Sequence, residues 1–361
     1  MGIPYFKIER IVKSNDVRVF SSNYALYADM SVRVLNTLAS FTPNIEPYSI
    51  DEAFLNLGKL GINDLTAYGK EIRKRIFKDT GIPVSVGIAA TKTLAKIANE
   101  YVKHNPKLCG VFDITAFPRM DRLLDHVPVY DVWGIGGAFG KMLMGREILT
   151  AKNFRDASES FVKSKMGVIG LRTQYELQGI STVDLDEVTG PKREIISSRS
   201  FGKYVTDIAE LEEAVSQYTI RAAEKLRKQS SICSIVYVTL QTNHHKLKDL
   251  QHAETRSITL AEPTNYTPVL IKHTEYLLRK VYRKGFNYIK AGVMLGGIFP
   301  DDTAQLSVFK SGDRLNQNRA MKAMDSINTA WGRDTLKIAS SGIVQKWAMK
   351  RQHISQRYTT K

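Results

Sequence analysis

The second half of the sequence alternates strand-like and helix-like apolar patterns in one fixed order. Four stretches have the β-branched and aromatic composition of strands, and two have the periodicity of helices. In chain order we expect a strand at 194–201, a helix at 207–228, strands at 232–240 and 255–260, a helix at 269–282 and a strand at 288–295. Asp207 and Glu210 have the spacing of a capping box at the start of the first helix. This order is that of the ferredoxin-like βαββαβ unit, so we predict such an α+β domain.

The first part of the chain also alternates strand-like and helix-like stretches. We expect strands at 17–20 and 83–89, helices from residue 24, at 64–81 and at 91–103, and two β-rich runs around residues 51 and 52. Asp64 stands where a helix N-cap is expected, and Gly81 stands at the end of the same helix. The alternation predicts a sheet packed against helices, ending near residue 115.

Changes in pattern divide the chain into four segments. Between 117 and 190 the helices are short and interrupted by glycine, and the run TGPKRE at 189–194 is typical of a linker. We expect segments at 1–116, 117–190, 191–300 and 301–361, the last of them largely polar.

The positive charge is concentrated in the second half of the chain. The sequence has 52 Lys+Arg and 36 Asp+Glu, a net charge of +16, and residues 191–361 contribute 28 − 15 = +13 of it. This excess favours a polyanionic partner, nucleic acid first and an anionic membrane second. The longest apolar run, 291–299, is about half the ~20 residues that a membrane helix needs. Cys109 and Cys233 are too few for a disulfide framework, so we predict a cytoplasmic protein without a membrane segment.

The acidic pair Asp51 and Glu52 interrupts an apolar, β-rich run. Two adjacent carboxylates can hold Mg²⁺ through oxygen ligands, as phosphoryl transfer requires. Neighbouring side chains on a regular strand point to opposite faces, so both can serve one site only if the backbone turns there, and Pro47 makes a turn plausible. The alternative is an edge strand with one exposed and one ion-paired acid.

Three lysines share one face of the helix expected at 91–103. They are Lys92, Lys96 and Lys103, at spacings of four and seven. Such a face can hold a triphosphate or a nucleic-acid backbone, and the alternative is a solvated helix face.

A glycine turn lies between two expected helical stretches. Gly134 and Gly136 in the run VWGIGG would let backbone N–H groups approach a DNA phosphate, as in a helix-hairpin-helix, although a plain tight turn has the same pattern. The run QLSVF at 305–309 has the composition of a short docking motif, and the alternative is a strand that packs on its own domain.

Together these residues resemble the Y-family of translesion DNA polymerases, and within it the UmuC type, the catalytic subunits of DNA polymerase V and their plasmid-borne relatives. The resemblance runs along essentially the whole chain. It is carried by FSSNYALYADMS (20–31), YSIDEAF (48–54), VGIAATKTLAKIAN (86–99), DVWGIG (131–136), SRSFG (198–202), RAAEKLR (221–227), KAGVMLG (290–296), AQL (304–306) and RYTT (357–360).

The resemblance implies a right-hand polymerase architecture. Residues 1–116 would be palm and fingers, 117–190 a helix-hairpin-helix thumb, 191–300 a DNA-gripping little finger, and 301–361 a tail with a clamp-binding motif. Asp51 and Glu52 would be catalytic ligands of a two-ion Mg²⁺ site, and Lys103 would bind the nucleotide triphosphate. DNA contacts would come from Lys92, Lys96, Gly134, Gly136 and Arg199, and sliding-clamp contacts from Gln305, Leu306 and Phe309.

One departure from the family pattern affects the expected activity. Family members begin with an acidic-aromatic strand that supplies a third metal-binding carboxylate and an aromatic gate against ribonucleotides, and this sequence has no such strand. We therefore expect a truncated palm and negligible primer extension by this polypeptide.

Three functions remain open at this point. The first is error-prone translesion synthesis in the SOS response and DNA repair, on primer–template DNA, with a sliding clamp, a processed UmuD-type subunit and a recombinase filament as partners near the bacterial nucleoid. The second is a catalytically dead remnant that binds only damaged DNA and the clamp. The third, another palm-domain enzyme such as a nucleotide cyclase, is disfavoured by the glycine turn and the basic βαββαβ domain.

Overall fold

The computed structural model describes residues 3–115, 117–185, 190–303 and 311–359, with the side chains of residues 303 and 311–314 excepted. The chain forms two compact units. Unit 1 comprises Met1–Thr189 together with Ile354–Lys361, and unit 2 comprises Gly190–His353. The chain therefore passes from one unit to the other twice.

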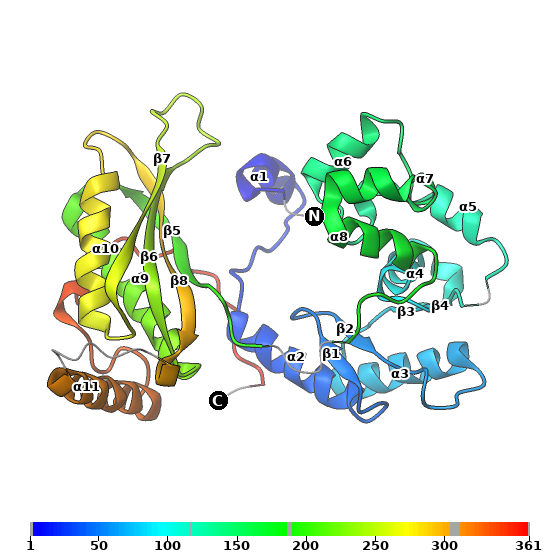
Figure 1. The fold of residues 1–361 in the computed structure, drawn as a ribbon, viewed down its shortest axis with the longest axis horizontal. Coiled ribbons are helices and arrows are strands. Elements are labelled where there is room, and N and C mark those ends of the chain that lie inside the picture. Colours follow the sequence, from blue (N-terminus) through cyan, green and yellow to red (C-terminus); the bar gives the residue numbers. More distant parts are fainter. Residues whose placement is uncertain (1–2, 116, 186–189, 304–310, 360–361) are drawn as a thin grey trace. The chain divides into compact units, whose positions relative to one another are not determined.

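Unit 1 contains mostly helices and short strands (Figure 1). Its helices are α1 (Tyr5–Ser14), α2 (Tyr24–Leu38), α3 (Leu65–Thr80), α4 (Lys92–Lys103), α5 (Met120–Asp125), α6 (Gly137–Met144), α7 (Ala151–Arg155) and α8 (Glu159–Leu177), with 3₁₀ turns η1 (Pro106–Leu108) and η2 (Val129–Asp131). Its strands are β1 (Ile45–Pro47), β2 (Ala53–Leu55), β3 (Val86–Ile88) and β4 (Val111–Asp113).

The strands of unit 1 form two separate pairs rather than the single sheet expected from the sequence. β1 and β2 are antiparallel, and β3 and β4 are parallel. The strand expected at 17–20 is wrong, since a strand needs a partner and Val17, Val19 and Phe20 are exposed. Next to this segment, Ser21 forms an isolated bridge to Ile354.

Two helices of unit 1, α3 and α4, begin and end where the sequence predicts. The Asp64 side chain accepts a hydrogen bond from the Ala67 N–H at 2.8 Å and caps α3, while Gly81, with φ of 73°, ends it in the left-handed region. Thr91 caps α4 by accepting from the Leu94 N–H at 3.3 Å. Both predicted helices are confirmed.

α4 lies very close to β3. A Cβ at Gly87 would be 2.3 Å from the Asn99 nitrogen and 2.4 Å from the Ala95 oxygen, so only glycine fits at this position. This contact fixes α4, which carries the three lysines, against the parallel strand pair.

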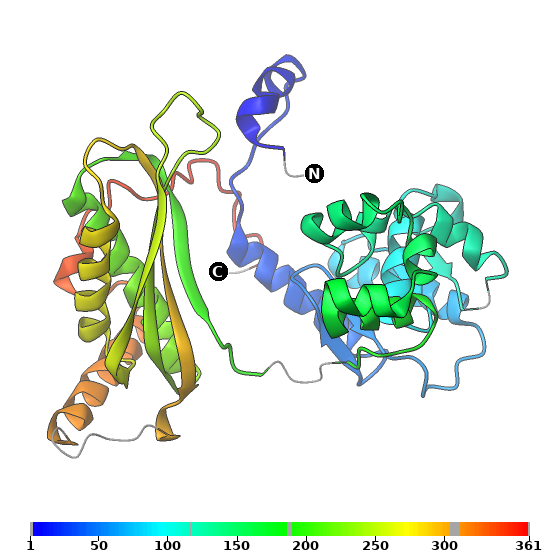
Figure 2. The same cartoon turned by 45° about the horizontal axis from the view of Figure 1, so that its top comes forward.

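Unit 2 has the predicted βαββαβ order (Figures 1 and 2). Its elements are β5 (Ile195–Val205), α9 (Ile208–Lys228), β6 (Ser231–Thr242), β7 (Ala253–Thr264), α10 (Thr267–Val281), β8 (Tyr288–Pro300), the 3₁₀ turn η3 (Asp301–Thr303), α11 (Ser311–Ala330) and the 3₁₀ turn η4 (Ala339–Ser341). The sheet order is β5-β8-β6-β7, with every neighbouring pair antiparallel. The expected capping box forms only in part: Asp207 accepts from the Ala209 N–H, but the Glu210 carboxylate pairs with Lys203 at 3.1 Å.

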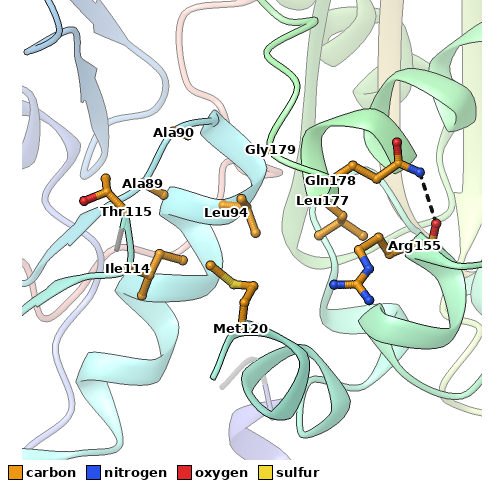
Figure 3. Close-up of a pocket in the computed structure, with 10 residues that line it drawn as sticks. All are labelled: Ala89, Ala90, Leu94, Ile114, Thr115, Met120, Arg155, Leu177, Gln178 and Gly179. Atoms are coloured by element: carbon orange, nitrogen blue, oxygen red, sulfur yellow. Dashed lines mark hydrogen bonds between the residues drawn. The ribbon is translucent and has the colours of Figure 1, made fainter. Parts of the chain in front are cut away.

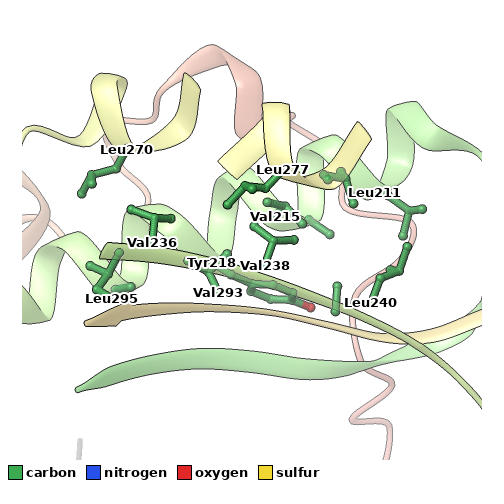
Figure 4. Close-up of a cluster of buried hydrophobic side chains, with 14 of the residues drawn as sticks. Leu211, Val215, Tyr218, Val236, Val238, Leu240, Leu270, Leu277, Val293 and Leu295 are labelled. Carbon is green, nitrogen blue, oxygen red and sulfur yellow. The ribbon is translucent and has the colours of Figure 1, made fainter. Parts of the chain in front are cut away.

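The core of unit 2 lies between the sheet and the helices α9 and α10. Figure 4 shows side chains from both helices meeting side chains from β6 and β8 in this layer. Alternate residues on the strands point into the core, among them Val236, Val238 and Leu240 of β6. The intervening residues form the other, open face of the sheet.

Candidate active site

Asp51 and Glu52 lie in the turn that joins β1 to β2. The Glu52 carbonyl oxygen accepts hydrogen bonds from the N–H groups of Tyr48 and Ser49, each at 3.0 Å, so the backbone reverses here as a shared site requires. Asp51 is exposed, and its carboxylate accepts a hydrogen bond from the Ser49 hydroxyl at 2.5 Å. The turn therefore presents both acids at the end of one hairpin.

α4 faces this hairpin with two of its lysines. The Lys96 ammonium lies 2.8 Å from each oxygen of the Glu52 carboxylate. One helical turn earlier, Lys92 donates to the Glu46 carboxylate of β1 at 2.5 Å and to the Asp184 carbonyl at 2.6 Å. Two ion pairs thus join the helix to the first strand and to the turn of the hairpin.

Lys92 does not lie on a solvated helix face, which was the alternative for the three lysines. Its side chain is 9% exposed and that of Glu46 is 11% exposed, because the pair is enclosed between α4 and β1. The Lys96–Glu52 pair is more accessible, at 26% and 32%. Lys92 is therefore a structural residue of this site and is not available as a DNA contact.

Three aromatic rings hold the glycine turn against the hairpin. Trp133 Nε1 donates a hydrogen bond to the Tyr48 hydroxyl at 2.9 Å, and the rings of Tyr48, Phe54 and Trp133 lie 5.6–5.7 Å apart. Lys96 lies 5.1 Å from the Tyr48 ring centre and Lys92 lies 5.3 Å from that of Phe54, so each lysine also makes a cation–π contact. The sequence analysis missed this cluster, although all three aromatics lie in its motifs.

The glycine turn follows Trp133 directly. Gly134 has φ of 90°, which favours glycine, and Gly136 is the N-cap residue of α6. A helix follows the turn as predicted, but the element before it is the 3₁₀ turn η2 rather than an α-helix. The contacts that Trp133 makes with Tyr48 and Phe54 therefore hold the backbone of this loop beside the hairpin.

Glu176 of α8 positions α4 and was missed from the sequence. This fully buried side chain accepts hydrogen bonds from the N–H groups of Thr93 at 3.1 Å, Thr182 at 2.8 Å and Val183 at 3.2 Å. A carboxylate at the first turn of a helix is stabilised by the unpaired N–H groups and the helix dipole. Glu176 thereby fixes the helix that presents Lys92 and Lys96.

Lys103 lies at the far end of α4, seven residues or about 10 Å of helix from Lys96. Its ammonium pairs with Glu100 at 3.0 Å, and this hydrogen bond holds the pKa of the Glu100 carboxyl below its usual value. The structure therefore places Lys103 about two helical turns from Lys96, the lysine that contacts Glu52.

Arg199 does not lie on the open face of the unit 2 sheet. It pairs in register with Ala291, which belongs to the core, so both lie on the face that the helices cover. The open face instead carries Ser198, Thr239 and Lys290 around a shallow cavity of about 160 Å³. Gln305, Leu306 and Phe309 lie outside the described residues.

The hairpin fits a magnesium site in part. Asp51 and Glu52 offer the hard oxygen ligands that Mg²⁺ prefers, and Asp51 is accessible. Both oxygens of Glu52 are occupied by Lys96, however, and the described residues hold no cluster of three His, Cys, Asp or Glu side chains that could bind a metal. The hairpin thus supplies two carboxylates, fewer than a closed two-ion site uses.

Unit 1 has a cavity of about 180 Å³ where β3 and β4 end (Figure 3). Figure 3 shows Leu94, Ile114 and Met120 on one side of it and Leu177 and Arg155 on the other. Among the described residues that line it, Arg155 is the one with a charge, and it pairs with Asp121 and Asp156, each at 2.7 Å. The charge of Arg155 is therefore already balanced within the protein.

None of the helices in the described ranges is both long and apolar enough to span a bilayer.

Comparison with known proteins identifies three matching regions. The model of the impB/mucB/samB family matches residues 1–100, that of its C-terminal domain matches 192–308, and a domain of unknown function (DUF4113) matches 318–361. The chain is 41% identical to the protein UmuC and 38% identical to the protein ImpB, both of Salmonella typhimurium, over 100% of this chain and 86% of each relative. It is 27% identical to DNA polymerase IV of Desulfatibacillum aliphaticivorans, over 88% of this chain and 78% of that protein.

Among solved structures, a Y-family DNA polymerase chimera matches with a TM-score of 0.64 at 20% identity, over 83% of both chains. The fold is thus that of the Y-family DNA polymerases. Within that class, the chain belongs to the family of UmuC, ImpB, MucB and SamB, the UmuC-like subunits of error-prone translesion DNA polymerases.

Proposed function

We propose that the Asp51–Glu52 hairpin is part of the reaction centre with which this chain takes part in Mg²⁺-dependent DNA synthesis across damaged templates. The observation that carries the proposal is the turn itself, in which two adjacent carboxylates lie at a hairpin end faced by the basic side of α4. In nucleotidyl transfer the primer 3′-hydroxyl attacks the α-phosphate of a deoxynucleotide, and pyrophosphate leaves. Bound Mg²⁺ supplies charge stabilisation for both oxygens involved.

The residues of the site would have separate roles. Asp51 and Glu52 would hold Mg²⁺, and Lys96 would orient the Glu52 carboxylate and balance its charge. Lys103, at the other end of α4, would bind the triphosphate as a point charge. The backbone N–H groups around Gly134 and Gly136 would contact a DNA phosphate.

Unit 2 would hold the DNA duplex on the open face of its sheet. That face carries hydroxyl and ammonium groups, such as those of Ser198, Thr239 and Lys290, which suit phosphate and sugar contacts independent of sequence. The net charge of +13 in residues 191–361 supports the same assignment.

The remaining partners follow from the family. Gln305, Leu306 and Phe309 would bind a sliding clamp, and a processed UmuD-type subunit and a recombinase filament would assemble with the chain. With these partners the protein would act in the cytoplasm of a bacterium, at the nucleoid.

One observation favours a second candidate, a protein that binds DNA and the clamp without catalysis. Both Glu52 oxygens are engaged by Lys96, and the described residues supply two carboxylates at the hairpin. Such a protein would compete with intact polymerases for primer ends.

Primer extension past an abasic site distinguishes the two candidates. The 361-residue chain is compared with a form extended in frame by the acidic upstream segment that the family resemblance implies, and DNA binding is followed in parallel by fluorescence anisotropy. We expect both forms to bind primer–template DNA, and we expect any synthesis to require Mg²⁺.

In the extended form, Asp51→Asn and Glu52→Gln should abolish synthesis and leave DNA binding intact. Synthesis that survives both substitutions would remove the hairpin from the reaction centre. DNA binding without synthesis by either form would favour the second candidate.

A further inference from the structure

The C-terminal segment, residues 331–359, belongs to both units. It runs from the end of α11 along unit 2 to His353, and from Ile354 onward it belongs to unit 1. The whole of this segment lies in the region, residues 318–361, that matches a domain of unknown function. Its contacts show how it is fixed at each end.

Trp347 anchors the segment in unit 2. Its side chain is 3% exposed and belongs to the core of that unit, with its ring 5.7 Å from the Tyr218 ring and 6.3 Å from the Phe201 ring. The Trp347 carbonyl also accepts a hydrogen bond from the Gly202 N–H at 3.1 Å. A Cβ at Gly202 would lie 2.4 Å from the Ala348 oxygen, so β5 and the segment are in direct backbone contact.

An ion-pair network adds a second attachment to unit 2. Asp334 accepts hydrogen bonds from Arg221 and, at 3.2 Å, from Gln217, both on one face of α9. In α11, which precedes the segment, Asp325 forms a two-point pair with Arg227 of α9 at 2.7 and 2.8 Å. The segment is thus an integral part of unit 2 up to its last residues.

Asn23 anchors the segment in unit 1. This side chain is 6% exposed and caps α2, accepting from the Leu26 N–H at 3.3 Å with its oxygen. Its amide nitrogen donates to the Ser355 carbonyl at 3.0 Å, to the Ser355 hydroxyl at 3.2 Å and to the Gln356 carbonyl at 3.5 Å. The oxygen of this buried amide therefore binds its own helix, and the nitrogen binds the C-terminal segment.

Two further contacts extend this docking along α2. Ser21 and Ile354 form a parallel β-bridge, and Arg33 donates to the Thr359 carbonyl at 3.5 Å. The docked stretch therefore runs beside α2 from its N-cap through its third turn.

We propose that the N-terminal end of α2 is a docking site for the chain's own C-terminus, and that the segment is a strap between the two units. Seven Cα–Cα steps separate Trp347 from Ile354, which limits these anchors to a separation of about 25 Å. The strap restricts how far unit 2 moves from unit 1. It adds a second connection to the one at 189–190.

The test measures inter-unit distances in the full chain by pulsed electron paramagnetic resonance. Spin labels are attached at Lys78→Cys in α3 and Lys272→Cys in α10, both exposed, in a Cys109→Ser background. Asn23→Asp is the decisive variant, because aspartate caps a helix as well as asparagine does but cannot donate to Ser355. A chain that ends at His353 is the matched deletion.

We expect the distance distribution to broaden and to shift to longer values in both variants. The thermal unfolding midpoint of Asn23→Asp should stay close to that of the parent. An unchanged distribution in both variants would overturn the strap. A change in the deletion alone would overturn the docking role of Asn23.

Discussion

Lys96 and Glu52 join α4 to the candidate reaction centre, with the ammonium 2.8 Å from both carboxylate oxygens. A metal ion at the hairpin must compete with this ammonium for the same oxygens. Removal of the ammonium should therefore strengthen metal binding.

We predict that Lys96→Met raises the Mn²⁺ affinity of the hairpin about threefold, because a partly exposed ion pair is worth up to about 1 kcal/mol. The measurement is titration of free Mn²⁺ by electron paramagnetic resonance. Lys103→Met removes the same charge two turns away and should have little effect. Equal or weaker Mn²⁺ binding by Lys96→Met would show that Lys96 does not compete with the metal.

Lys92 should matter for stability rather than for DNA binding. Lys92→Met leaves the buried Glu46 carboxylate without its ammonium partner, which costs about 3–5 kcal/mol for a buried pair. Hydrogen exchange of the α4 amides should show this loss, and Lys92→Met combined with Glu46→Leu should recover most of it. If the α4 amides of Lys92→Met exchange as slowly as those of the wild type, the structural role of Lys92 is contradicted.

Gly87 should tolerate no side chain. Gly87→Ala forces β3 and α4 apart, because the new Cβ would be 2.3 Å from a backbone nitrogen. We expect the free energy of unfolding to fall by about 1–3 kcal/mol or more. Gly136→Ala is the control, since a Cβ there has open space. A thermal unfolding midpoint lowered equally in both variants would contradict the close approach of α4 to β3.

The open face of unit 2 should carry the DNA contacts. Lys290→Glu is expected to weaken primer–template binding and to lower the slope of log Kd against log salt by about one. Lys272→Glu makes the same charge change on α10, which lies on the other side of the sheet, and should have a smaller effect. If both variants lose DNA affinity equally, the loss reflects the change in net charge and not a DNA contact on the open face.

The sequence predicted the local structure of this chain better than its long-range pairing. α3 and α4 appear at the expected positions because Asp64, Gly81 and Thr91 act within their own helices. The stretch at 17–20 has the composition of a strand, but within the described part of the chain it pairs with no other strand. Composition reports a local preference, whereas a strand also needs a neighbour.

The site follows the same rule. The acidic pair and the lysine face were identified from spacing. That they form one site depends on long-range contacts: Lys96 is 44 positions from Glu52, and Lys92 is 46 positions from Glu46. Glu176 has an ordinary place in a helix, and only its complete burial against α4 shows its role. Lys92 was assigned to DNA because helical spacing cannot show which lysine a neighbouring strand covers.

Metal-directed cleavage of the chain tests the central claim most directly. Fe²⁺ replaces Mg²⁺ in the complex with primer–template DNA and a deoxynucleotide, and ascorbate with peroxide then cuts the backbone close to the bound ion. The hairpin assignment predicts cleavage within residues 45–56 that disappears in Asp51→Asn and Glu52→Gln. Cleavage confined to other parts of the chain, or unchanged in both variants, would contradict it.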